Sequence, residues 1–111
     1  MATDEKQRRF YEAMAERFGV LADPTRLAVI HCLMKGDEQN VTSIVGATGC
    51  DHSKVSKHLR VLRNAGLVER RKEGLQVFYR LSDPLVEKLC REVCESLMAE
   101  FEPDTGDENP C

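Results

Sequence analysis

The 111-residue chain contains no tryptophan, two tyrosines and four phenylalanines. A chain this small with so few aromatic side chains buries only a modest share of its surface, so we expect one domain that gains from sharing a core with a second copy. It has no apolar run of 18 residues and no apolar stretch near its start, which argues against a membrane span and a signal peptide. We therefore expect a cytoplasmic protein with no membrane contact.

Features typical of enzymes are also missing. There is no glycine-rich phosphate loop and no Cys-x-x-Cys redox pair, and so short a chain leaves little room for a substrate cleft. We therefore do not expect an enzyme, although a cysteine at a helix start (Cys50) resembles an activated thiol. The five cysteines are odd in number and lack the spacing of a disulfide scaffold, which favours free thiols, ligands or sensors.

Acidic residues are absent from residues 52–68, while four cations occur there. Residues 51–80 carry eight Lys or Arg against three acids, a net charge of +5 in a chain whose total is −3, so the remainder carries −8. Binding to phosphates depends on the local field and not on the total charge. The asymmetry predicts a protein that binds a polyanion with one face.

The cationic segment has the pattern of a bracketed helix. Asp51 is suited to cap its start and Gly66 to end it, which predicts a helix over about 52–65. Val55, Leu59 and Leu62 form one narrow apolar stripe, so the remaining side chains face outward. The outward side chains are Ser53, Lys54, Ser56, Lys57, Arg60, Arg63 and Asn64.

The flanking segments predict a winged helix-turn-helix. A short helix over 41–48 is broken by Gly49 just before the cationic helix. After it, two strand-like segments (67–72 and 75–81) flank Glu73-Gly74, a hairpin signal, with Arg70, Arg71 and Lys72 expected at the tip. In the second strand Val77, Tyr79 and Leu81 alternate toward the domain. The expected fold is mostly α with a small β-hairpin wing.

Three further helices are expected. The first, over 4–22, has an apolar face of Phe10, Met14, Phe18 and Leu21. The second starts at Asp23-Pro24, runs to about residue 35, and should bury Leu27, Ile30 and Met34. The last, over about 84–101, is apolar over more than half its circumference, so its own domain and a partner should both cover it. The apolar side chains are Leu85, Val86, Leu89, Cys90, Val93, Cys94, Leu97, Met98 and Phe101.

Several motifs in this order resemble the ArsR/SmtB family of bacterial repressors. They are LADPTRLAVIHCL, HSKVSKHLRVLRNAGLVERRKEGLQVFYRL and SDPL, and the resemblance covers about residues 10 to 100. It implies a homodimeric repressor that dimerises through its first and last helices and binds double-stranded DNA. We expect two recognition helices in successive major grooves of an imperfect palindromic operator.

The DNA-binding side chains that we expect lie on the recognition helix and the wing. His58 has two interpretations, a DNA contact or a hydrogen bond back into its own domain. The expected set is Ser53, Lys54, Ser56, Lys57, His58, Arg60, Arg63, Arg70, Arg71 and Lys72.

Cys90 and Cys94 are one helical turn apart, a spacing that suits two thiolates sharing one soft ion such as As(III) or Cd(II). A third ligand would come from Cys111, from Cys32 or from the partner subunit. The other interpretation is that both cysteines only pack. The resemblance implies a second type of inducer, reactive sulfur or peroxide, sensed by Cys32 and a last-helix cysteine. A third possibility is a repressor without thiol chemistry, and no cofactor is required in any of the three.

Other family sites match this sequence less well. The Cys-x-Cys pair of arsenic-responsive members is replaced by Asn40-Val41-Thr42. The family's zinc site is matched only by the acid Asp83, because Leu85 stands where a histidine is expected. Cys32, His31 and Cys50 each have a packing interpretation as well. We expect residues 1–101 to form the domain and 102–111 a disordered acidic tail.

Overall fold

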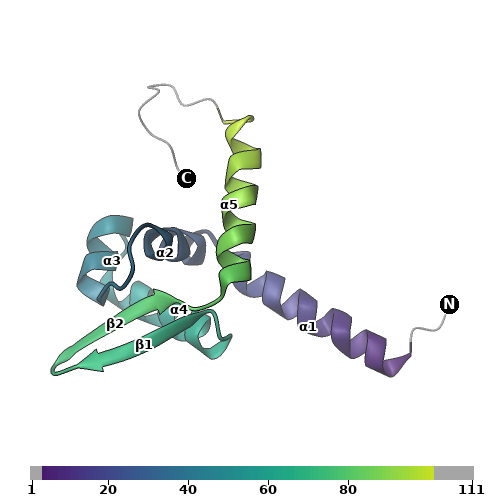
Figure 1. Cartoon of the computed structure of the whole chain (residues 1–111), viewed down its shortest axis with the longest axis horizontal. Helices are drawn as coiled ribbons and strands as arrows, with labels where there is room; N and C mark the ends of the chain where they lie inside the picture. Colours follow the sequence, from purple (N-terminus) through teal and green to yellow (C-terminus); the bar gives the residue numbers. More distant parts are fainter. Residues whose placement is uncertain (1–3, 102–111) are drawn as a thin grey trace.

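The computed structural model describes residues 4–101. The described chain is mostly helical with one antiparallel hairpin, which confirms the predicted fold class (Figure 1). None of its helices combines the length and the apolar character that a membrane span requires. The elements in chain order are α1 (Glu5–Leu21), α2 (Pro24–Lys35), α3 (Val41–Thr48), α4 (His52–Asn64), β1 (Val68–Glu73), β2 (Gln76–Leu81) and α5 (Pro84–Met98).

The helix boundaries follow the capping signals in the sequence. A side-chain oxygen of the residue before each helix accepts a hydrogen bond from a backbone N–H of the first turn, as expected for an N-cap. The capping residues are Asp4, Asp23, Asn40, Asp51 and Asp83. Gly49 (φ 74°) separates α3 from α4, and Gly66 (φ 80°) follows α4. The last helix is shorter than predicted, since α5 ends at Met98 and the chain then turns.

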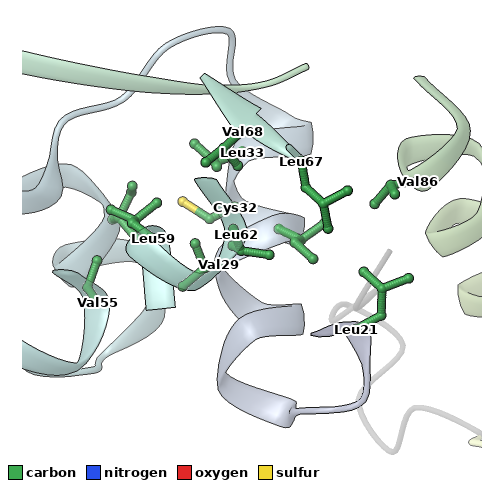
Figure 2. Close-up of a cluster of buried hydrophobic side chains, with 12 residues drawn as sticks. Leu21, Val29, Cys32, Leu33, Val55, Leu59, Leu62, Leu67, Val68 and Val86 are labelled. Atoms are coloured by element: carbon green, nitrogen blue, oxygen red, sulfur yellow. The ribbon is translucent and has the colours of Figure 1, made fainter. Parts of the chain in front are cut away.

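One apolar core joins all the helices and the first strand. Val55, Leu59 and Leu62 of α4 are fully buried in it, so the predicted apolar stripe of the recognition helix is confirmed (Figure 2). No polar or charged side chain of residues 4–101 is fully buried. The core residues are Leu21, Val29, Ile30, Cys32, Leu33, Ile44, Val55, Leu59, Leu62, Leu67, Val68 and Val86.

The predicted core face of α2 is wrong in part. Ile30 is buried, but Leu27 is 42% exposed and Met34 is only half-buried, while Val29 and Leu33 point into the core. The reason is that α2 is apolar on two faces, and periodicity alone does not say which face the domain covers. Its second face, with Leu27 and Met34, lines a groove beside α1 and α5.

The wing turn lies one residue later than predicted. Glu73 pairs with Gln76 across the hairpin, so the two-residue turn is Gly74-Leu75 and not Glu73-Gly74. Gly74 has φ 62°, the left-handed conformation that the first position of a II′ turn requires. The three basic residues therefore lie within β1, and the fully exposed Leu75 occupies the tip.

Helices α1 and α5 project from the body in different directions (Figure 1). Their apolar faces find little cover within the chain: Phe10 is 61% exposed, Phe18 53% and Leu97 42%. An ion pair ties the two helices, since Arg17 Nη1 of α1 lies 3.2 Å from Oδ2 of Asp83, the N-cap of α5. The predicted apolar faces are thus present, and several of their side chains remain exposed among residues 4–101.

Candidate nucleic-acid interface

The outward face of α4 is cationic. Lys54, Lys57, Arg60 and Arg63 are all exposed, while Val55, Leu59 and Leu62 hold the opposite face in the core. Across residues 4–101, no acid lies within ion-pair distance of these four cations. Cations on a surface usually reduce their mutual repulsion by pairing with acids. This face is therefore suited to bind an external polyanion.

The smaller polar side chains of α4 lie around these cations. Ser53 is exposed near the helix start and Ser56 is half-buried. His58 is half-buried and turned back into its own domain, where its Nδ1 lies 3.3 Å from Nη1 of Arg26. Of the two interpretations of His58, the intramolecular hydrogen bond is the one that the structure contains.

The wing divides its basic residues between two faces. Arg71 lies opposite Phe78 in the hairpin register, and its guanidinium carbon lies 5.1 Å from the centre of the Phe78 ring. It donates to both carboxylate oxygens of Glu38, from Nε at 2.9 and 3.2 Å and from Nη2 at 3.0 Å, and from Nη1 to Glu73 at 3.1 Å. The hydrogen bonds from Arg71 hold the pKa of Glu38 below its ordinary value. Arg71 therefore anchors the wing to the loop between α2 and α3.

Arg70 and Lys72 alternate with Arg71 along β1 and project from its other face. Both are exposed, and neither has an acidic partner within residues 4–101. Among residues 4–101, Arg71 alone of the seven predicted cations is paired with acids. The other six, which have no acidic partner in that range, are Lys54, Lys57, Arg60, Arg63, Arg70 and Lys72.

Three residues that organise this region were not predicted from the sequence. Gln39 forms an isolated β-bridge with Tyr79 of β2, and Glu38 beside it binds Arg71. Arg26 contacts His58 of the recognition helix. Arg26 follows the cap Asp23 in the DPTR segment, but no local pattern signals the other two, because Glu38 and Arg71 are 33 residues apart in sequence.

Cys90 and Cys94 line one apolar groove of about 690 Å³ between α1, α2 and α5. Phe18, Leu27 and Leu97 are also in its wall. Cys90 is a free thiol, and burial raises its pKa above the ordinary value. Cys94 is disulfide-bonded. The sulfur atoms of Cys90 and Cys94 are therefore both available as thiolates only when the disulfide of Cys94 is reduced.

The remaining cysteines have different surroundings. Cys32 is a buried free thiol whose Sγ donates to Oε1 of Gln39 at 3.2 Å, and burial raises its pKa. It does not line the groove that contains Cys90 and Cys94, whereas its neighbour His31 does. Cys50 is a half-buried free thiol in the turn before α4, 4.0 Å from the Thr48 carbonyl oxygen. Cys111 lies outside the described residues, as does the predicted tail 102–111.

Within residues 4–101, no three His, Cys, Asp or Glu side chains are grouped so that they could hold a metal ion. Asp83, the one match to the family's zinc site, is occupied by helix capping and by Arg17. A metal at Cys90 and Cys94 would therefore need a third ligand from outside this part of the chain.

Comparisons with known proteins agree with this geometry. Residues 23–70 match the profile of the bacterial regulatory protein, arsR family. A transcriptional repressor SmtB homolog from Synechocystis sp. is 39% identical over 97 residues, which are 87% of this chain and 69% of that protein. The arsenical resistance operon repressor of Escherichia coli is 42% identical over 65 residues, 59% of this chain and 56% of that protein.

A solved structure extends the similarity to the whole fold. The homodimeric winged helix-turn-helix DNA-binding domain from Mycobacterium bovis superposes with a TM-score of 0.74 and 28% identity, covering 93% of this chain and 94% of that one. These proteins regulate transcription by binding DNA and are not enzymes. The chain belongs to the ArsR/SmtB family of winged helix-turn-helix transcriptional repressors.

Proposed function

We propose that the chain acts as a homodimer that places two copies of α4 in successive major grooves of an imperfect palindrome, about one helical turn apart. The observation that supports the proposal is the cationic face of α4, which has no acidic partner within residues 4–101 and is backed by the apolar core. DNA binding needs no cofactor, and the protein works in the cytoplasm. We propose that residues 1–101 form the DNA-binding and dimerisation domain.

The second copy would cover the apolar surfaces of α1 and α5. Phe10, Phe18, Val93 and Leu97 are each more than 40% exposed, and three of them line or adjoin the groove beside α2. Large apolar surfaces of this kind on a small domain mark an interface. The Mycobacterium bovis relative is homodimeric, which supports a second copy as the occupant.

Within the DNA-binding face we assign different tasks to the side chains. Lys54 and Lys57, in the N-terminal half of α4, contact phosphates or base edges in the major groove together with Ser53 and Ser56. Arg60 and Arg63 bind the phosphate backbone further along the helix. On the wing, Arg70 and Lys72 bind DNA directly. Arg71 and His58 act from within the protein, since both are engaged there.

The lysine assignment predicts a change in salt dependence. Lys54→Gln and Lys57→Gln should each weaken binding and, where the lysine meets a phosphate, reduce the slope of log K against log salt by about 0.9. Fluorescence anisotropy on a labelled duplex measures both. Lys88→Gln in α5 is the matched control, because Lys88 is exposed but lies outside α4 and the wing. Equal slopes for all three variants would refute the assignment.

We propose that a soft metal or metalloid releases the repressor by binding Cys90 and Cys94 in their reduced form. Two thiolates at positions i and i+4 of a helix suit As(III) or Cd(II). A third thiolate would come from Cys111 or the partner subunit. The Escherichia coli relative is an arsenical resistance operon repressor, which supports this class of inducer.

Binding in the groove would alter the contact between the two copies and hence the spacing of their recognition helices. Allosteric couplings of about 1–3 kcal/mol are typical, which weakens operator binding about 5-fold to 150-fold. This is enough to empty an operator that is occupied near its Kd.

The inducer proposal predicts which variant stops responding. In the presence of a non-thiol reductant, As(III) or Cd(II) should release wild-type protein from its operator about 5-fold to 150-fold, and the double variant Cys90→Ser/Cys94→Ser should stay bound. Anisotropy titrations with As(III), Cd(II) and zinc in the reductant, and with persulfide and peroxide after its removal, measure the release. Cys50→Ser is the control, since Cys50 lies in the turn before α4. If the double variant responds like wild type, the two cysteines only pack.

Oxidative sensing is the second candidate, because Cys94 is disulfide-bonded. In this candidate, persulfide or peroxide would remove two electrons and two protons from a pair of thiols that includes a cysteine of α5. Cys32 is the less favoured partner, since its thiol is free, buried and engaged by Gln39. Release by persulfide or peroxide, but not by As(III) or Cd(II), would favour this candidate. A repressor without thiol chemistry would respond to none of the agents.

A further inference from the structure

Arg26 joins three segments of the chain through one side chain. Its backbone N–H donates to Oδ1 of Asp23 at 2.9 Å, which places it in the capped first turn of α2. Its Nε donates to the carbonyl oxygen of Val20, in the last turn of α1, at 2.7 Å. Its Nη1 lies 3.3 Å from Nδ1 of His58, in the middle of α4. One guanidinium thus links the end of α1 to the recognition helix.

The chemistry of the contact sets the state of the histidine. A guanidinium group only donates hydrogen bonds and does not lose its proton in proteins. Nδ1 of His58 must therefore accept, and the imidazole is neutral in this arrangement. Asp23 caps the same turn of α2, and its pKa is held below the ordinary value mainly by the hydrogen bond from the Arg26 backbone N–H, with a smaller contribution from the charge of Arg26.

The position of His58 on α4 makes the contact relevant to DNA reading. It follows the exposed Lys57 and precedes the fully buried Leu59, so it lies at the border between the outward face and the core. The apolar stripe fixes how deeply α4 sits, but apolar packing is non-directional and specifies rotation of the helix about its axis less well than a hydrogen bond. The bond to Arg26 supplies that direction.

We propose that Arg26 and His58 are positioning residues for DNA recognition, which hold the orientation of α4 relative to the end of α1 so that its lysines meet the operator in register. The proposal rests on the DNA-binding role of α4 proposed above. Neither side chain needs to touch DNA, and Arg26 is half-buried. The alternative is that His58 contacts DNA itself and that its bond to Arg26 is incidental.

Two substitutions of His58 separate these roles. In His58→Asn, the amide oxygen can take the place of Nδ1 as acceptor, whereas His58→Leu has no acceptor at all. We expect His58→Leu to bind the operator about tenfold more weakly, as for loss of one charge-assisted hydrogen bond. Its affinity for random duplex and its salt slope should equal those of wild type, so the preference for operator falls. His58→Asn should restore most of that preference.

Two further variants test whether the loss of operator preference comes from the lost Arg26–His58 contact and not from unfolding. Arg26→Gln should reproduce the loss of preference, and the double variant Arg26→Gln/His58→Leu should lose no more than either single one, because both remove the same contact. Thermal unfolding of each variant shows that the folded form is being compared. Additive losses in the double variant would overturn the proposal, as would an operator preference in His58→Leu equal to that of wild type.

The remaining outcomes are also distinct. If His58→Asn and His58→Leu lose affinity equally and both reduce the salt slope, His58 contacts DNA directly and the positioning role is wrong. If wild-type protein itself shows no preference for any duplex, the proposed function fails, whatever the variants do.

Discussion

Leu97→Glu should convert the dimer to a monomer and lower operator affinity about 100-fold or more, because two linked half-site contacts bind that much more tightly than one. Leu97 is 42% exposed on α5 and lines the apolar groove beside Phe18. In the proposed dimer this surface is buried, and burying a carboxylate in an apolar interface without a partner costs several kcal/mol. Sedimentation equilibrium measures the oligomeric state, and anisotropy measures the affinity.

Ser96→Glu is the matched control for this variant. Ser96 is the neighbouring residue on α5, is exposed and does not line the groove, so the same charge should leave the dimer intact. Phe18→Glu on α1 should behave like Leu97→Glu, since Phe18 lies in the wall of the same groove. A Leu97→Glu protein that remains dimeric and binds its operator normally would place the interface elsewhere.

Leu59→Ala should reduce the free energy of unfolding by about 2–5 kcal/mol. Leu59 is fully buried in the core, to which α2, α3, α4 and β1 all contribute residues (Figure 2). Removing its isobutyl group loses transfer free energy and leaves a cavity that rigid neighbours fill only in part. Since small domains have about 5–15 kcal/mol of stability in total, DNA binding at 37 °C should fall as well.

Chemical denaturation at fixed protomer concentration measures this loss, because the stability of a dimer depends on concentration. Lys57→Ala, two residues earlier on the exposed face, should change stability by no more than about 0.5 kcal/mol. A loss below about 1 kcal/mol for Leu59→Ala would mean that the recognition helix is not held by the core as described.

The elements predicted best from sequence are those with both a cap and a stripe. Asp51, Val55, Leu59 and Gly66 specify the recognition helix locally, and the structure has it where they predict it. The hairpin was predicted one residue out of place, because Glu73-Gly74 and Gly74-Leu75 both offer a glycine for the turn. Only the pairing of the two strands decides between them.

Local patterns did not predict which apolar faces the domain covers. Leu27 of α2 and Phe18 of α1 have the spacing of core residues, yet both line an open groove. Periodicity shows that one face of a helix is apolar, but whether that face is buried depends on which other element of the fold packs against it. The same limit applies to Arg71, a basic wing residue by sequence, which is bound by an acid 33 residues away.

The cysteines show how little spacing alone says about chemistry. The i, i+4 spacing of Cys90 and Cys94 is present on α5, but whether the pair binds an ion depends on redox state and on a third ligand. Whether Cys32 can pair with a cysteine of α5 depends on which face of α2 carries its side chain. Because successive residues of a helix differ by about 100°, His31 faces the groove and Cys32 faces Gln39.

The most direct test of this account is selection of bound sequences from a random duplex library by the wild-type protein. A homodimer with one α4 in each of two successive major grooves should enrich an imperfect inverted repeat whose half-sites are about 10 base pairs apart, centre to centre. Enrichment of a single unrepeated half-site, or of no sequence at all, would contradict the account.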